Sequence, residues 1–163
     1  MKRGAELNNR LRRTAFVCLG SVLSLALAAP VSASGPTIEH GRIEERFLDD
    51  FILELCGIET FTTLTQSFTV KVFPDGSEQI HVVRTFVPED PRIPVERGAA
   101  TTFVTPDGTR TVVGKPIQLF GPDGGVRLLD AGLVTFEEEL LVRGPHPSLE
   151  VDNLAPFYCP SGT

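Results

Sequence analysis

The sequence lacks the short motifs that mark many enzymes and ligand-binding proteins. Its 163 residues contain no GxSxG, no P-loop, no glycine-rich dinucleotide pattern, no HExxH and no spaced D-x-D-x-D-G calcium loop. There is also no CxxC, and no histidine lies within ten residues of Cys56 or Cys159. These absences leave hydrolase, nucleotide, zinc and calcium chemistry unsupported. We therefore predict no catalytic constellation, no cofactor-binding residues and no metal ligands.

Basic residues are scarce outside the N-terminus. Residues 1–33 hold 5 of the 15 Lys and Arg, placed ahead of an apolar run from Thr14 to Ala29. Val31 and Ala33 follow at the spacing that signal peptidase reads, so we predict a signal peptide over 1–33 and a secreted, extracellular protein. An uncleaved membrane anchor is the alternative, although the run is shorter than the roughly 20 residues of a bilayer span.

Removal of this segment changes the charge of the chain. It leaves 10 basic and 20 acidic residues, a formal charge of −10, and no basic run. Phosphate backbones and anionic lipid surfaces attract proteins of the opposite charge. We therefore predict no nucleic-acid partner, and no membrane partner after cleavage.

Cysteine is equally scarce. With Cys18 inside the predicted signal peptide, an exported chain keeps only Cys56 and Cys159. Two cysteines in an oxidising compartment are expected to pair, so we predict a disulfide between them. A pair of free thiols in a catalytic or metal site is the competing interpretation, but it would call for a nearby histidine. The residues before Cys159, "LAPFY", predict a C-terminal tail that packs on the sheet near Cys56.

One tripeptide, Pro-Asp-Gly, punctuates the chain at residues 74–76, 106–108 and 122–124. Pro sets φ for the second turn position, Asp bonds to the backbone that follows it, and Gly accepts the left-handed conformation that closes a hairpin. The sequence thus predicts three hairpins.

The flanking segments alternate with period two, as "LTQSFTVKVF" shows, which is typical of strands with one buried face. Pro116 lies within one such segment and predicts an edge or a bulge there. About six to eight short strands at regular spacing predict an all-β fold, an antiparallel meander that forms a small barrel or a sandwich.

Residues 34–55 form an N-terminal arm ahead of the β domain, which we place at 56–163. Within the arm, Ile43, Phe47 and Phe51 recur at helical spacing, which predicts a helix over 43–55. Phe47, Phe51 and Leu55 also share one face of a strand, so strand remains the alternative.

Several segments together resemble a group of small, uncharacterised secreted proteins of actinobacteria. They are "LCGI", "FPDGS", "LLDAGLVTF", "RGPHP" and a late single cysteine, and the similarity covers roughly Leu55 to Cys159. The resemblance implies an exported β-rich domain with one disulfide, and it implies no activity. The arrangement is also faintly similar to the eight-stranded barrels of the lipocalin and allene oxide cyclase type, at the level of fold alone.

The three histidines are the natural candidates for acid–base chemistry. His81 lies on a predicted strand and is a weak candidate for a general base if it points into a barrel cavity. A surface histidine on a polar strand face is the simpler interpretation. His146 lies between two prolines in a predicted turn, and His40 in a predicted mobile arm.

Two functions therefore follow from the sequence. The first is a secreted, non-enzymatic β domain that binds a small apolar ligand or a protein partner. The alternative is a small β-barrel isomerase or cyclase that acts on a hydrophobic substrate. A buried His81 inside a closed barrel would favour the second function, and a solvent-exposed His81 would favour the first.

Overall fold

A computed structural model of the protein describes residues 35–137 and 140–160. The predicted signal peptide lies outside the described residues. The elements, in chain order, are β1 (Thr37–Leu48), α2 (Asp50–Cys56), β2 (Phe61–Val72), β3 (Glu78–Pro88), β4 (Val95–Val104), β5 (Arg110–Phe120), β6 (Val126–Phe136), β7 (Leu140–Arg143), α3 (Pro147–Glu150) and α4 (Ala155–Tyr158). None of the helices in the described part of the chain is long and apolar enough to cross a membrane.

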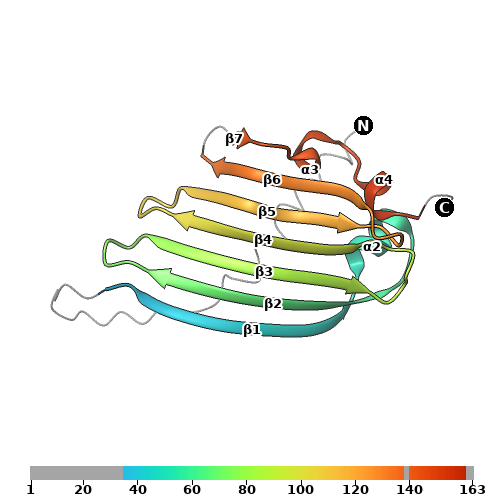
Figure 1. The fold of residues 1–163 in the computed structure, drawn as a ribbon, viewed down its shortest axis with the longest axis horizontal. Coiled ribbons are helices and arrows are strands. Elements are labelled where there is room, and N and C mark those ends of the chain that lie inside the picture. The colour runs from blue at the N-terminus through green and yellow to red at the C-terminus, as the bar shows by residue number, and fades with distance from the viewer. Residues whose placement is uncertain (1–34, 138–139, 161–163) are drawn as a thin grey trace. The chain divides into compact units, whose positions relative to one another are not determined.

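The strands form one antiparallel sheet whose spatial order is the chain order, β1 to β7 (Figure 1). The predicted all-β meander is confirmed, with seven strands. The sheet is not closed into a barrel, because β1 and β7 lie at opposite edges of it. Figure 1 shows α2 and α4 at one end of the strands and α3 beside β6.

All three Pro-Asp-Gly tripeptides close hairpins, as predicted. They connect β2 to β3, β4 to β5 and β5 to β6. In the first, Gly76 has a φ of 83° and donates its N–H to the carbonyl of Phe73, while Asp75 accepts from the N–H of Ser77. The positive φ explains why glycine holds this position.

Pro116 lies at a bulge, the second of the two places predicted for it. Across β4 and β5, Arg97 pairs with Gln118 and Ala99 with Lys115, so two residues of β5 face Gly98 alone. A Cβ on Gly98 would lie 2.4 Å from the carbonyl oxygen of Pro116. The bulge therefore needs glycine at this position.

The helix predicted over 43–55 is wrong in its first half and right in its second. Residues 43–48 belong to β1 and pair with β2 without a register shift, so the arm is an outer strand of the sheet. Asp49 ends the strand, because its side chain accepts the N–H of Ile52 and caps α2. Its other carboxylate oxygen accepts the hydroxyl of buried Thr62 at 2.6 Å. The helix ends at Gly57, whose φ is 69°.

The predicted disulfide is confirmed. Cys56, at the end of α2, is bonded to Cys159, with 5.4 Å between their Cα atoms. Beside it, the ring of Phe51 meets that of Tyr158 edge to face, with 5.0 Å between centroids. Leu154 and Tyr158 are buried, so the C-terminal tail packs against the rest of the domain as the sequence predicted.

Candidate functional site

The register of the strands assigns every strand residue to one of two faces. Directly opposed residues of an antiparallel pair project to the same side. One face carries Thr62, Glu96 and Asp130. In the described residues, the side-chain hydrogen bonds between the helical segments and the sheet are made by these three side chains, with Asp49, Tyr158 and Ser148 respectively. We call it the helix-covered face. The opposite side, which carries the row His40, Thr69, His81, Thr101, Val113 and Leu133, we call the open face.

The open face exposes large apolar side chains. Phe103 is 44 % exposed and Val83 is 43 % exposed, and both would be expected in a core by their chemistry. Other apolar residues of this face that are more than one-third exposed are Ile38, Leu48, Phe61, Val87, Val113, Val126 and Leu141. Between them lie threonines, including Thr65, Thr85 and Thr101. The face is thus a mixed apolar and hydroxyl surface.

Charges are separated between the two faces. Glu44 is the one carboxylate at described strand positions of the open face, whereas Glu39, Glu45, Glu78, Glu96 and Asp130 project from the other side. The cationic residues of the open face are Arg42, Arg46, Lys71, Arg97, Lys115 and Arg143. A chain whose net charge is negative therefore presents one positively charged surface.

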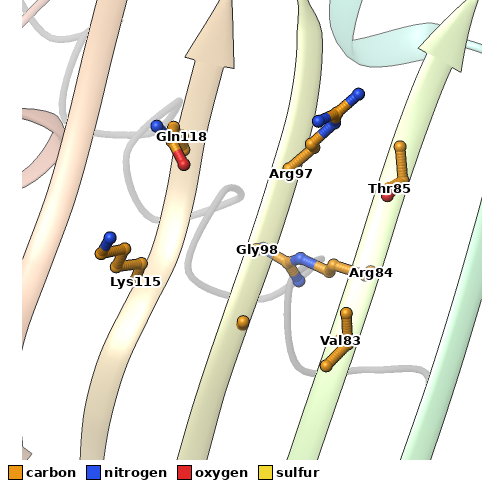
Figure 2. Close-up of a pocket in the computed structure, with 8 residues that line it drawn as sticks. Val83, Arg84, Thr85, Arg97, Gly98, Lys115 and Gln118 are labelled. Atoms are coloured by element: carbon orange, nitrogen blue, oxygen red, sulfur yellow. The ribbon is translucent and has the colours of Figure 1, made fainter. Parts of the chain in front are cut away.

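Two of these cations flank a shallow depression of about 230 Å³. Figure 2 shows side chains of the lining residues, which come from β3, β4 and β5. They are Val83, Arg84, Thr85, Arg97, Gly98, Ala99, Lys115 and Gln118. Gly98 and Ala99, which have little or no side chain, lie between the longer side chains of their neighbours. The depression lies over the bulge between β4 and β5.

Arg97 and Lys115 form no ion pair with any residue of the described chain. Arg97 instead places its guanidinium 5.1 Å from the centre of the Phe120 ring. By contrast, Arg46 on the same face is paired with Glu89 at 2.6 Å. Arg97 and Lys115 therefore remain able to pair with an anionic group from outside.

Both exposed histidines lie on the open face, two strands apart in one row. Nδ1 of His40 is 2.9 Å from Oγ1 of Thr69, and Nδ1 of His81 is 3.0 Å from Oγ1 of Thr101. His40 was expected in a mobile arm, but it is part of β1. His81 is exposed on an open sheet and does not point into a barrel cavity.

A half-buried polar cluster lies on the helix-covered face. The guanidinium of Arg84 is 3.3 Å from the Glu96 carboxylate, and the Tyr158 hydroxyl donates to the other carboxylate oxygen at 2.8 Å. Burial raises the pKa of Glu96, against the opposing effects of Arg84 and Tyr158. Burial and the adjacent Glu96 raise the pKa of Tyr158 well above its usual value. This cluster fastens the C-terminal tail to the middle of the sheet.

His146 differs from the other histidines, because it is only 1 % exposed. It lies before α3, and its Nε2 atom has no hydrogen-bond partner in the described structure. Nearby, Asp130 accepts hydrogen bonds from the N–H and the hydroxyl of Ser148. The turn expected between the two prolines is thus a packed segment beside β6.

His81 and the two cysteines were predicted as site residues from the sequence, whereas Arg97 and Lys115 were not. A partial signal exists in the alternation of charge along a strand. On β1, Arg42 and Arg46 share one parity and two of the three carboxylates fall on the other, and on β4 the adjacent Glu96 and Arg97 project to opposite faces. Which charges become neighbours across the sheet depends on the strand register, and the sequence leaves open whether Pro116 marks a bulge or an edge.

Comparison with models of protein families, with curated proteins and with solved structures finds no match to this chain.

Proposed function

We propose that this protein is an exported, non-enzymatic binding module whose open face docks an acidic protein partner. The observation that carries the proposal is the pair Arg97 and Lys115. They flank a depression on the open face and lack ion pairs in the described chain, although the protein as a whole is acidic. Complementary charge of this kind guides association and fixes which partner binds.

The apolar side chains of the open face support a protein partner. Exposed Val83 and Phe103 lie between cations and threonines, and the middle of a protein interface combines apolar, aromatic and arginine side chains in this way. A small apolar ligand receives less support, because the depression of about 230 Å³ is smaller than the roughly 300–1,000 Å³ of sites that enclose such ligands.

The position of His81 supports a non-enzymatic module over an isomerase or cyclase. A general base that acts on a hydrophobic substrate works in a site that excludes water. His81 is exposed, and the side-chain hydrogen bond described for it goes to the hydroxyl of Thr101.

Selection of displayed random peptides on the immobilised protein tests this proposal. We expect enriched peptides to combine Asp or Glu with apolar residues, and their binding to weaken as salt concentration rises. The double variant Arg97→Glu/Lys115→Glu should weaken binding about tenfold or more. Arg110→Glu reverses a charge on the opposite face of the sheet, and it should leave binding unchanged where Arg97→Glu or Lys115→Glu alone weakens it.

Failure to enrich acidic peptides, or binding that survives the Arg97 and Lys115 reversal, would overturn the proposal. Two further measurements identify the competing classes of ligand. Native mass spectrometry of the protein exported by its own host would reveal a copurifying small molecule. Tighter binding to single-stranded DNA or to an acidic polysaccharide than to the selected peptides would assign the face to another polymer.

A further inference from the structure

The outer edge of β1 is long and regular. All twelve residues from Thr37 to Leu48 pair with β2 in one unbroken register, and the strand contains no proline. As the first strand in the spatial order, β1 has no described neighbour on its other side. Alternate residues of an edge strand direct their N–H and C=O groups outward, where another strand can pair with them.

We propose that two copies of this protein pair through β1, antiparallel, with the two Ile43 residues opposite one another. The proposal is independent of the function proposed above. A two-fold axis perpendicular to the sheet relates the copies, so each residue must oppose one that projects to the same face. This condition allows only registers that are centred on a residue.

Charge distinguishes the registers near the middle of the strand. Centred on Ile43, Arg42 lies opposite Glu44 of the second copy, and the symmetry provides this pair twice. The same register places Ile38 opposite Leu48 of the second copy, again twice, and pairs residues 38–48 throughout. These contacts match opposite charges and cover exposed apolar side chains.

The two neighbouring registers are less favourable, because they place like charges opposite one another. Centred on Arg42, the pairing opposes the two Arg42 side chains and places Glu39 opposite Glu45. Centred on Glu44, it opposes the two Glu44 side chains and places Arg42 opposite Arg46. Like charges directly opposite one another destabilise strand pairing. Registers centred further away join fewer residues.

The side chains concerned are available for these contacts. Ile38 is 51 % exposed, Leu48 is 38 % exposed and Ile43 is 36 % exposed. Arg42 and Glu44 are 3.7 Å apart within one chain, and both side chains are largely exposed, so each can take a partner in the second copy. The two-fold axis would place both open faces on the same side of one continuous sheet.

Sedimentation velocity of the exported protein over a wide concentration range tests the pairing. We expect a reversible dimer. Arg42→Glu and Glu44→Arg each create like-charge contacts and should each weaken the dimer about tenfold or more. The double variant Arg42→Glu/Glu44→Arg restores opposite charges and should restore the dimer. Glu54→Arg, on the exposed surface of α2, is the matched control and should change nothing.

A second measurement does not depend on those variants. The Cα atoms of directly opposed residues lie about 4.5–5.5 Å apart, within the range of a disulfide, so Ile43→Cys should form an intermolecular disulfide on mild oxidation. Ile38→Cys is more exposed but faces Leu48, so it should remain uncrosslinked. A protein that stays monomeric at every concentration would overturn the proposal. So would a dimer that tolerates Arg42→Glu, or one that crosslinks equally through position 38.

Discussion

The hydroxyl of Tyr158 donates a hydrogen bond to the carboxylate of Glu96 at 2.8 Å, across 62 residues of sequence. Tyr158 immediately precedes Cys159, so the disulfide to Cys56 and this half-buried hydrogen bond hold the same turn of chain. Glu96 belongs to β4, in the middle of the sheet, whereas Cys56 ends α2. The C-terminal tail is therefore fixed both to the sheet and to the helix.

Replacing Cys56 with Ser should lower the free energy of unfolding by about 2–5 kcal/mol, because the bond closes a loop over a separation of 103 residues. Urea unfolding of the variant and of the oxidised wild type measures the loss. Reduced wild-type protein, which has the same sequence but no bond, should match the variant. Two reactive thiols per chain in the unfolded, unreduced protein would contradict the disulfide itself.

Tyr158→Phe should destabilise the protein by about 1–3 kcal/mol, because it leaves a buried carboxylate oxygen without its donor. The same substitution should cost less in a Glu96→Gln background, where no buried charge needs that donor. A double-mutant cycle by chemical unfolding measures the difference. Equal losses in both backgrounds would show that the hydroxyl does not act through Glu96.

Glu96→Gln should change how stability depends on pH. The pKa of Glu96 is raised in the folded protein above its ordinary value of 4.5, so the folded state holds this proton more tightly than the unfolded state does. The stability contributed by the protonated group is present below pH 4.5 and is lost as pH rises through the raised pKa. Wild type should therefore lose stability relative to Glu96→Gln as the pH rises above 4.5 and through the raised pKa. A difference that stays constant, or that changes in the opposite direction, would contradict the raised pKa.

Asp49→Ala should destabilise the protein by more than the roughly 1 kcal/mol that is typical of a lost helix cap. The substitution removes the acceptor of the Ile52 N–H and also that of the buried Thr62 hydroxyl. Asp50→Ala, one residue later and exposed, is the matched control and should cost only a few tenths of a kcal/mol. Thermal unfolding of both variants tests the ranking, and equal losses would rule out a special role for Asp49.

Much of this fold could be predicted from the sequence, because it depends on interactions between residues that are close together in the chain. Each Pro-Asp-Gly turn needs only its own residues to form, and the alternation in β2 is a property of one strand, so both were predictable. The disulfide was predictable because only two cysteines lie outside the predicted signal peptide. Residues 43–55 were harder, since Phe47 and Phe51 satisfy the spacing of a helix and of a strand. Thr62, 13 residues further along the chain, donates a hydrogen bond to Asp49 at the point where β1 has ended and α2 begins.

The candidate site depended on tertiary structure. Within a strand the period of two decides which residues share a face, but the register between strands decides which residues become neighbours across the sheet. The bulge opposite Gly98 brings Lys115 and Gln118 of β5 onto the same face as Arg97 and Ala99 of β4. The net charge of the chain does not reveal this arrangement, because it adds together the charges on both faces of the sheet. Only the folded sheet separates the cations of the open face from the carboxylates behind them.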